Sequence, residues 1–262
     1  MSQLANKVAI ILGAAGKDNM GQVIARRLHA EGAQVVVAGR HLDELERFSA
    51  EIDGLGVYCD ITSKADIEKL FAAAIERFGH VDTVVNATGW GLLKSFEDTT
   101  EDDLKKMCDL QYIGPYMLFQ EAVKRVIAPA SLIQISSATA SIMFEDHSAY
   151  MGTKAGIDHV VRCIANEYGN KGVRANSISP GLTDTPMTAE AKQTPGLFDA
   201  FVKGYPLGRI GTPDDIAAAI VWLAGDECFM TGENLQVNGG LTLRRNPMKT
   251  EIEASVVAAA GQ

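Results

Sequence analysis

A tyrosine and a lysine in the middle of the chain, Tyr150 and Lys154, have residue types and a spacing that suit chemistry. Residues four apart lie on one face of a helix, so the phenol, which can give or take a proton, and the ammonium can converge on one ligand. Such a pair alone also arises by chance. Here it follows Ser136 and Ser137, which end an apolar run, and the earlier segments of the chain indicate what the pair can act on.

The first of these segments is a glycine-containing turn between an apolar run at 8–12 and a helical pattern at about 21–30. Glycine lets a backbone turn tightly against a pyrophosphate, whose charge the free amides of the following helix stabilise. The spacing is not GxGxxG, and an ordinary strand–helix turn is the alternative, but the position after the first strand favours a dinucleotide. The candidate residues of this turn are Gly13, Ala15, Lys17, Asn19, Met20 and Gly21.

The end of the second apolar run, Ala38-Gly39-Arg40, indicates which dinucleotide binds. A carboxylate at this place would accept hydrogen bonds from the adenosine ribose and select NAD. The chain has none here, and Arg40 can grip a 2′-phosphate with two N–H bonds, to which Lys17 could add a second positive charge. The alternative for Arg40 is an ordinary surface arginine. We expect NADP(H) to be favoured over NAD(H).

Two further apolar runs end in residues that suit a nucleotide. Asp60 and Ile61 follow the third run, and a carboxylate such as Asp60 can accept a hydrogen bond from an adenine amino group. Small residues after the fourth run would let the cofactor lie against bare backbone. Ordinary turn chemistry is an equal alternative at both places. The residues after the fourth run are Asn86, Ala87, Thr88 and Gly89.

Each of these motifs follows an apolar run, and this pattern predicts the fold. The runs lie at 8–12, 35–38, before Asp60, at 81–85, 131–135 and 173–178, with helical patterns between them. One such helix has a capping-box pattern, Ser63-x-x-Asp66, and a stop at Gly79. Continuous apolar strands alternating with helices predict one α/β domain with a doubly wound parallel sheet covered by helices on both faces. Ligands bind such a sheet at the carboxyl ends of its strands.

Composition excludes several classes of protein. A net charge of −9 over 262 residues argues against a nucleic-acid surface, and the sequence lacks an apolar run long enough for a membrane span. The start of the chain does not fit a signal peptide. Four widely spaced cysteines fit neither a metal site nor a disulfide framework, so we expect no metal and a reducing cytoplasm. The cysteines are Cys59, Cys108, Cys163 and Cys228.

Later segments complete a set of motifs in order: 176–185 (NSISPGLTDT), 206–216 (PLGRIGTPDDI), Thr231-Gly232 and Asn238-Gly239-Gly240. With the turn and the Tyr150–Lys154 pair, they resemble the short-chain dehydrogenase/reductase family, in its single-domain branch of roughly 250 residues. The resemblance implies a Rossmann-type domain over 1–240, with a substrate lid at about 187–205 and a tail at 241–262. It also implies a homo-oligomer, which is either a dimer or a homotetramer.

The family's mechanism, carried over to this chain, makes Tyr150 the acid for carbonyl reduction or the base for alcohol oxidation. Ser137, thirteen residues earlier, would hold the substrate oxygen, and Lys154 would bind the nicotinamide ribose and lower the pKa of the tyrosine. An ammonium ~5 Å away at an effective dielectric of ~20 supplies about 3 kcal/mol of the roughly 4 kcal/mol needed to lower a phenol pKa from ~10 to ~7. The nicotinamide would be bordered by Pro180, Gly181, Thr183 and Thr185.

The chain departs from the family in two places. Its glycine turn has Leu12 where the family has threonine, is two residues longer, and has Asn19 where a glycine is usual, which is similar to enoyl reductases of the same superfamily. Those space Tyr and Lys more widely, so we favour carbonyl chemistry. Gln111 replaces the family's asparagine at a helix break. Since Pro115 has no N–H to donate to the carbonyl of Gln111, we expect that carbonyl to hold the water of a proton relay.

The substrate is less well defined. Trp90, Met143 and Phe144 suggest a mostly apolar pocket; His147 could bind substrate, but an exposed loop histidine is the favoured interpretation. For the tail at 241–262, disorder and packing on another subunit both remain open. We expect an NADP(H)-dependent carbonyl reductase or alcohol dehydrogenase acting on a small molecule. The alternative is a protein that binds NADP(H) as a sensor or scaffold without turnover.

Overall fold

The computed structural model describes residues 3–261. Its centre is a parallel sheet of seven strands in the order β3-β2-β1-β4-β5-β6-β7, so the strand order reverses between β1 and β4. Ligands bind doubly wound sheets at this reversal, beyond the carboxyl ends of the strands. The strands are β1 Val8–Leu12, β2 Gln34–Gly39, β3 Leu55–Tyr58, β4 Thr83–Asn86, β5 Ala130–Ile135, β6 Val173–Pro180 and β7 Asn234–Val237.

The apolar runs of the sequence form the central strands, and the predicted doubly wound α/β fold is confirmed. β1, β4 and β5 are buried along their whole length, as expected for strands covered on both faces. The two edge strands differ from the sequence pattern. β3 ends at Tyr58, two residues before Asp60, and β7 has no continuous apolar run, because edge strands are only partly covered.

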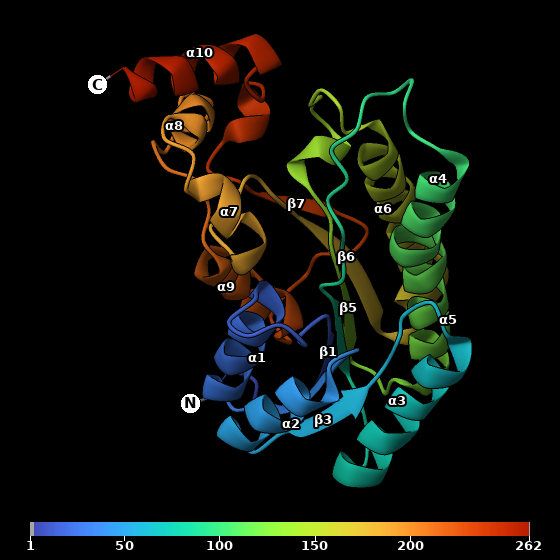
Figure 1. Ribbon diagram of the computed structural model, residues 1–262. Coiled ribbons are helices and arrows are strands. Elements are labelled where there is room, and N and C mark those ends of the chain that lie inside the picture. The colour runs from blue at the N-terminus through green and yellow to red at the C-terminus, as the bar shows by residue number, and fades with distance from the viewer. Residues whose placement is uncertain (1–2, 262) are drawn as a thin grey trace.

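Helices cover both faces of the sheet (Figure 1). On one face α1, α2 and α9 pack around a cluster that includes Ile24, Phe48 and Ile220. On the other face α3, α5 and α6 pack around Phe71 and Phe119. The bounds of these helices and of α4 are α1 Met20–Ala30, α2 Leu42–Glu51, α3 Lys64–Phe78, α4 Glu101–Cys108, α5 Gly114–Arg125, α6 Ser148–Tyr168 and α9 Pro213–Ala224.

The start and stop signals of α3 act largely as the sequence predicts. The Ser63 hydroxyl caps the helix by accepting from the Asp66 amide, and Gly79 ends it with a left-handed φ of 86°. The reciprocal half of the capping box is not formed. The Asp66 carboxylate instead accepts from the backbone amide of Asp60, at 3.3 Å, and so ties the start of α3 to the end of β3. The cap thereby holds the loop that carries Asp60.

Beyond β6 the chain forms short helices on one side of the molecule (Figure 1). The segment expected as a lid contains α7 Ala189–Lys192 and α8 Leu197–Val202, and the tail contains α10 Lys249–Ala260. The sequence left open whether the tail is disordered or packs on another subunit; in the structure α10 packs against α8 of the same chain. The remaining helical turns are η1 Asp109–Ile113, η2 Ala138–Ala140, η3 Gly169–Lys171, η4 Pro186–Thr188 and η5 Leu241–Leu243.

Between residues 3 and 261, no helix combines the length and the apolar character that crossing a membrane would require. The four cysteines are free thiols; Cys59 and Cys228 are buried, and Cys108 and Cys163 are exposed. In the same range, the structure brings no group of three or more His, Cys, Asp or Glu side chains together as a metal site.

Candidate active site

The glycine turn after β1 is closely packed against the end of β4 and the start of α1. A Cβ on Gly13 would lie 2.6 Å from the carbonyl carbon of Ala87, and one on Gly21 would lie 2.6 Å from the carbonyl oxygen of Gly13. Gly13 also has a φ of 107°, which side-chain-bearing residues rarely adopt. The two glycines are therefore needed for this turn to pass between β4 and α1.

Asn19, which stands where the family usually has glycine, joins the two ends of the lengthened turn. Its side-chain oxygen accepts from the Gln22 amide and caps α1, while its Nδ2 donates to the carbonyl of Gly13, at 2.9 Å. Its own φ is −72°, so no glycine is required at this position. Asparagine in place of glycine at this position therefore makes the backbone less flexible and adds hydrogen bonds that connect the two ends of the turn.

The start of α1 suits an anion. The backbone amides of Met20 and Gly21 have no hydrogen-bond partner among residues 3–261, and α1 has no acidic residue in its first turn. By contrast α2, α4 and α9 each have acidic residues there. Free amides and a positive helix end without a nearby carboxylate fit the pyrophosphate of a dinucleotide.

Arg40 lies exposed just after β2 and differs from the neighbouring arginines. Arg26, Arg27 and Arg47 all form ion pairs with carboxylates, whereas Arg40 makes no hydrogen bond or ion pair with the residues that the structure describes. Lys17 is also exposed and makes none with those residues. The guanidinium is thus free to meet an anionic ligand.

Asp60 lies in the loop after β3, held in a turn by Thr62. Its Oδ1 accepts from the Thr62 amide, at 2.9 Å, and from the Thr62 hydroxyl, at 2.8 Å. Burial alone would raise the pKa of Asp60, but these hydrogen bonds and the charge of Arg40 outweigh it and hold the pKa below its usual value. Ile61 is buried, and its carbonyl oxygen would lie 2.9 Å from a Cβ on Gly114. The Asp60 carboxylate is therefore ionised and fixed.

The segment after β4 is braced by Asn86, whose side chain is occupied within the protein. Its Nδ2 donates to Gln134 at 2.9 Å, and its Oδ1 accepts from the amide and hydroxyl of Thr88. Turn chemistry therefore accounts for the Asn86 side chain, and the backbone of 87–89 is what remains for a ligand. A Cβ on Gly89 would lie 3.9 Å from Nζ of Lys154, so this segment reaches the catalytic candidates.

Ser137, Tyr150 and Lys154 come together beyond the end of β5. Lys154 is 3% exposed, and its Nζ donates to the carbonyl of Ile135, at 2.8 Å, and lies 5.5 Å from the centroid of the Tyr150 ring. The hydroxyl of Ser137 accepts from the amide of Thr139, at 3.2 Å, lies 2.9 Å from the Thr139 hydroxyl, and is near enough to the phenol of Tyr150 to lower its pKa. The three candidate catalytic residues therefore share one site.

The pKa of the tyrosine shifts in the direction opposite to the expected one. Burial raises the pKa of Tyr150 to about 12, against the opposing effect of the Ser137 hydroxyl and with a further rise from the Asp158 carboxylate. Burial also lowers the pKa of Lys154 to about 8, although Asp158 opposes this. Lys154 makes no contribution to the pKa of Tyr150 in this structure, and the buried surroundings disfavour the charged form of each residue. Tyr150 is a protonated phenol at neutral pH.

Gln111 lies in η1, a π-helical turn that joins α4 to α5. The expected helix break is thus a widened turn in a continuous helix, in which the Gly114 amide bonds the Asp109 carbonyl five residues back. The side chain of Gln111 is buried beside the catalytic candidates, donating to the Thr153 hydroxyl at 3.3 Å and accepting from the Trp90 amide at 3.4 Å. The proton relay through its backbone carbonyl remains a prediction.

The loop after β6, expected to border the nicotinamide, is fixed by Tyr205. The Tyr205 hydroxyl accepts from the Leu182 amide, and its ring leaves no room for a side chain at Gly181. Thr183 is buried and donates to the carbonyl of Gly181, at 3.0 Å. A cavity of about 590 Å³ is lined by Asp18 of the glycine turn together with Asp184, Thr185, Pro186, Ala189, Lys192 and Gln193.

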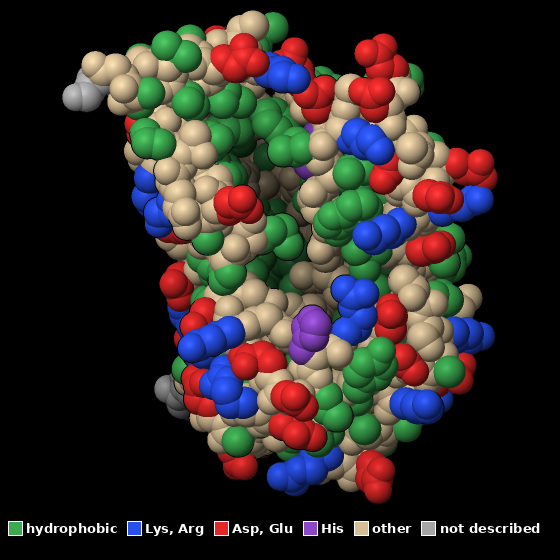
Figure 2. All heavy atoms as spheres, in the orientation of Figure 1, with side chains coloured by type: hydrophobic (Ala, Val, Ile, Leu, Met, Phe, Trp, Pro, Cys, Tyr) green, Lys and Arg blue, Asp and Glu red, His purple; other side chains and the backbone are tan. Residues whose placement is uncertain are grey.

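The face above the sheet is hollowed between the side of the molecule that carries α7, α8 and α10 and the side that carries α4 and α6, and hydrophobic side chains gather in its depth (Figures 1 and 2). An apolar cluster of Ala138, Phe201, Tyr205 and Leu241 lies next to Ser137, in the loop after β5, and Phe144 is packed against it. The cluster joins the residue after Ser137 to α8 and the tail. This arrangement suits a small apolar substrate.

Comparisons with known proteins agree with this geometry. Residues 13–242 match the family described as Enoyl-(Acyl carrier protein) reductase. The chain is 35% identical to trans-4-hydroxycyclohexanecarboxylate dehydrogenase of Sinomonas cyclohexanicum, over 93% of this chain and 96% of that protein. It is 30% identical to D-threitol dehydrogenase of Mycolicibacterium smegmatis, over 92% and 95%. A solved double mutant of a Serratia marcescens short-chain dehydrogenase/reductase is similar in structure, with a TM-score of 0.85 and 25% identity over 92% of this chain and 99% of that one.

This chain belongs to the short-chain dehydrogenase/reductase family. Members of the family use NAD or NADP, and the curated relatives are dehydrogenases of CH–OH groups, which supports oxidoreduction of alcohols or carbonyl compounds by this chain. The free amides of α1 and the tight glycine turn fit such a cofactor.

Two residues of this short-chain dehydrogenase/reductase site were not singled out from the sequence. Asp158 is a partly buried carboxylate one helical turn after Lys154, and its Oδ2 accepts from Ser136 at 2.7 Å and Asn234 at 2.6 Å. Tyr205 anchors the loop after β6. A four-residue spacing from Lys154 was the available signal for Asp158. No pattern near Tyr205 marks its long-range contact.

His147 is a correction to the sequence interpretation. The favoured interpretation was an exposed loop histidine, but its ring is partly buried and stacks on the ring of Tyr150, with centroids 4.3 Å apart. The three-residue spacing between the two side chains places them on adjacent turns at the start of α6, which is the signal that could have indicated this contact.

Proposed function

We propose that this short-chain dehydrogenase/reductase is an NADP(H)-dependent enzyme that interconverts a ketone or aldehyde and an alcohol. The observation that carries the proposal is the convergence of Ser137, Tyr150 and Lys154 at the end of β5, next to the segment after β4. A sensor or scaffold without turnover, the other candidate, has no need of all three. Gln111 in place of asparagine is the only departure that favours a sensor.

In the proposed reaction Tyr150 gives its phenolic proton to the carbonyl oxygen during reduction and takes it back during oxidation. Ser137 donates a hydrogen bond to the same oxygen and so holds it within reach of the phenol. NADPH, when bound, supplies the hydride for reduction. Lys154 would hold its nicotinamide ribose, and Pro180, Gly181, Thr183 and Thr185 would border the nicotinamide.

The raised pKa of Tyr150 supports reduction as the reaction that runs well at neutral pH. A phenol whose pKa is about 12 is fully protonated at pH 7 and can act as an acid. The same phenol is a poor source of phenolate for oxidation. We therefore expect oxidation to accelerate toward alkaline pH while reduction does not require it.

The preference for NADP(H) rests on the free guanidinium of Arg40. All three neighbouring arginines pair with carboxylates, while Arg40 faces none within pairing distance among residues 3–261. Gly39 provides no carboxylate for ribose hydroxyls. A guanidinium at this strand end suits the two N–H bonds that a 2′-phosphate accepts.

The substrate we propose is a small, mostly apolar ketone or secondary alcohol. An apolar cluster that includes Ala138 and Phe201, with Phe144 packed against it, lies next to Ser137. Relatives named for trans-4-hydroxycyclohexanecarboxylate, D-threitol and meso-2,3-butanediol support a compact substrate. We also propose a homo-oligomer, a dimer or tetramer, as the family resemblance implies.

The test is NADPH oxidation with a panel of compounds: cyclohexanone, acetoin, an aldehyde, a quinone, a 3-oxoacyl thioester and an enoyl thioester. Turnover of a ketone or aldehyde supports the proposal. Tight NADPH binding with no turnover of any compound would favour the sensor. Turnover of the enoyl thioester alone would make the chain an enoyl reductase, in keeping with the description of the matched family.

A further inference from the structure

His147 occupies the position that normally caps a helix, yet it does not cap α6. It precedes Ser148 with a φ of −129° and a ψ of 15°, and its side chain makes no hydrogen bond to the first turn. By contrast, the side chains of Asn19, Ser63 and Thr100 each accept a hydrogen bond from a backbone amide in the first turn of α1, α3 and α4. The imidazole is therefore directed to other contacts.

Those contacts surround the ring on three sides. It stacks on Tyr150, with centroids 4.3 Å apart and ring planes 25° apart, and it meets the ring of Phe144 edge-on at 5.8 Å. Its Nδ1 lies 2.7 Å from the carbonyl oxygen of Leu92, in the segment after β4. Because a carbonyl oxygen only accepts, Nδ1 carries the proton. Burial lowers the pKa of His147, so the imidazole is neutral.

The backbone that presents His147 is itself held in place. Asp146 adopts a left-handed φ of 58°, and its carbonyl accepts from the Lys94 amide, at 2.7 Å. Its carboxylate pairs with Lys249 of the tail, at 3.0 Å. The loop before α6 is thus fastened to two distant segments. A rigid support on this side means that the stacked ring limits where the Tyr150 ring can lie.

We propose that His147 is a positioning residue for Tyr150: a neutral ring, fixed by Leu92, that holds the phenol in place for proton transfer and shields it from water. The proposal rests on the proposed role of Tyr150 and adds a residue to it. The stack is what matters here, since the charged and hydroxyl groups around Tyr150 lie elsewhere. They are Lys154 and Asp158 on α6 itself and Ser137 from the loop after β5.

Two substitutions separate the ring from its hydrogen bond. His147→Phe keeps an aromatic face for the stack and loses the donor to Leu92. His147→Asn keeps a side-chain donor and loses the ring. If the stack positions and shields the phenol, the Phe variant should keep kcat within about 3-fold, while the Asn variant should lose about 10- to 100-fold, as misplaced catalytic groups do. The KM for NADPH should change little in either.

The pH profile provides the readout that a merely structural role would not change. Burial is the main cause of the raised Tyr150 pKa, so removing the covering ring admits water and lowers that pKa. Reduction needs the protonated phenol, and its rate falls as the pH rises through this pKa. Between pH 6 and 11 the phenol of the wild type and of His147→Phe stays protonated, whereas His147→Asn should show an additional alkaline fall of kcat/KM as its phenol deprotonates; any fall due to Lys154, whose pKa is about 8, should be common to all three.

The measurement is steady-state reduction of cyclohexanone and of acetoin with NADPH from pH 6 to 11, with Tyr150→Phe as the reference variant. An active Tyr150→Phe enzyme would remove the proposed role of Tyr150, on which the role of His147 rests, and would leave the proposed oxidoreductase activity standing. An inactive Tyr150→Phe enzyme, together with wild-type kcat and pH profile in His147→Asn, would overturn the positioning role alone. Equal losses in both His147 variants, without the additional alkaline fall in His147→Asn, would also overturn it. Thermal melting of each variant shows that it is folded.

Discussion

At the scale of single residues, the site is dominated by burial. The pKa values of Tyr150 and Lys154 are shifted toward their neutral forms, and partial burial also raises the pKa of Asp158. Electrostatic attraction between Lys154 and Asp158 opposes both of their shifts without reversing them. The proposed acid–base group, Tyr150, therefore begins as a neutral phenol, and the charge that would develop on a substrate oxygen is what the proposed site has to accommodate.

Replacing Tyr150 with Phe should abolish reduction and leave NADPH binding within a few-fold. The hydroxyl acts mainly in the transition state, where the proton moves, and contributes little to the bound ground state. The check is kcat for cyclohexanone beside a fluorescence titration of NADPH. A variant that retains more than about a tenth of the wild-type kcat would show that another group supplies the proton.

Replacing Arg40 with Leu should weaken NADPH binding about 10- to 100-fold, because one charge-assisted hydrogen bond contributes roughly 1.5–3 kcal/mol. NADH lacks the 2′-phosphate, so its affinity should barely change. The measurement is kcat/KM for both cofactors in the wild type and the variant. If the wild type already prefers NADH, or if kcat/KM falls equally for both cofactors in the variant, Arg40 is an ordinary surface residue.

The matching gain of NADH preference needs two substitutions in this structure. A carboxylate at Gly39 would accept from the ribose hydroxyls, but a Cβ on Gly39 would lie 2.5 Å from the Cβ of Ala15. We therefore expect Gly39→Asp alone to disturb the glycine turn and to weaken the binding of both NADH and NADPH. Gly39→Asp combined with Ala15→Gly should bind NADH in preference to NADPH, whereas Ala15→Gly alone should leave the preference unchanged.

At the scale of elements, the glycine turn shows how a departure from a family pattern can be compensated. The turn is longer than usual, and Asn19 supplies two hydrogen bonds that connect its far end to Gly13 and to α1. The backbone amides at the start of the helix are thereby held at the end of β1. The same side chain, Asn19, therefore caps α1 and holds the turn that we propose binds the cofactor.

Replacing Asn19 with Ala should therefore cost both stability and cofactor affinity. Loss of the cap should lower the free energy of unfolding by about 1 kcal/mol, and the loosened turn should weaken NADPH binding several-fold. Ser63→Ala is the matched control, because Ser63 caps α3 away from the glycine turn. Urea unfolding and NADPH titration of both variants provide the check. Similar NADPH affinity in the two variants would show that the brace does not serve the cofactor.

The elements that could be predicted from the sequence are those with local signals. β1 and α1 follow from a buried run and an amphipathic pattern, and α3 from its cap and its terminal glycine. β7 was missed because an edge strand has no buried run to mark it. The π-helical turn at Gln111 depends on Gly114 packing against the carbonyl of Ile61, a contact distant in sequence.

The candidate site follows the same division. The sequence could bring its candidate catalytic residues together because short spacings place Ser137, Tyr150 and Lys154, whereas the charges on them depend on burial that spacing does not reveal. The role of His147 was misjudged because its partner across the loop, Leu92, is far away in sequence. Sequence motifs therefore indicate which residues could act as acid or base, and tertiary packing determines their pKa values and contacts.

At the scale of the whole molecule, the tail connects two parts that flank the substrate side. Asn246 donates to the carbonyl of Met143, at 3.1 Å, and Lys249 bonds Glu145 and Asp146. Ser255 donates to the carbonyl of Gly196 at the start of α8, at 2.7 Å. The loop before α6 and the start of α8 are thus held by one segment.

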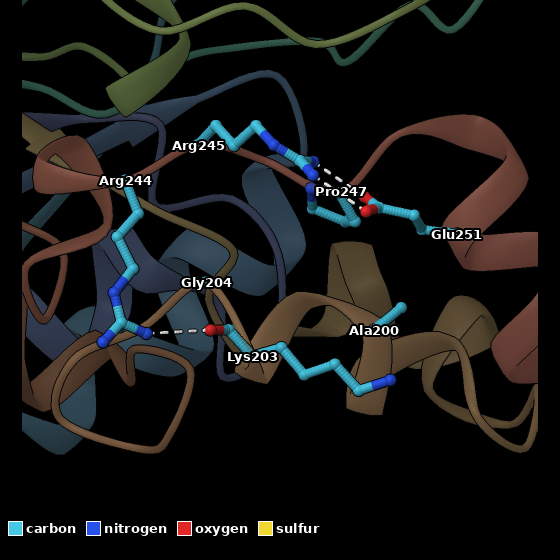
Figure 3. A pocket seen from close by; sticks show the side chains of 7 residues that line it. All are labelled: Ala200, Lys203, Gly204, Arg244, Arg245, Pro247 and Glu251. Atoms are coloured by element: carbon cyan, nitrogen blue, oxygen red, sulfur yellow. Dashed lines mark hydrogen bonds and ion pairs between the residues drawn. The ribbon is translucent and has the colours of Figure 1, made fainter.

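The tail is stiffened by one internal pair and tied to the end of α8 by a further hydrogen bond. Arg245 forms two hydrogen bonds with Glu251, and Arg244 donates to the carbonyl of Lys203, as Figure 3 shows. These residues line a cavity of about 320 Å³ between α8 and the start of the tail. The cavity lies apart from Ser137, Tyr150 and Lys154, none of which lines it. Its walls therefore join α8 to the tail.

A chain that ends at Pro247 should keep its fold and its cofactor affinity but lose much of its activity toward ketones. The two large clusters that hold the sheet and helices include no residue of α10, so the melting temperature should fall only a little. Without α10, the start of α8 and the loop before His147 each lose an anchor, and the walls of the substrate site loosen. We expect the KM for cyclohexanone to rise about 10-fold or more and the Kd for NADPH to stay within about 2-fold, since the lost order lies on the substrate side. A chain that ends at Ala260 keeps α10 and serves as the control. Unchanged ketone kinetics in the shorter chain, measured beside that control, would mean that the lid and the loop are held without the tail.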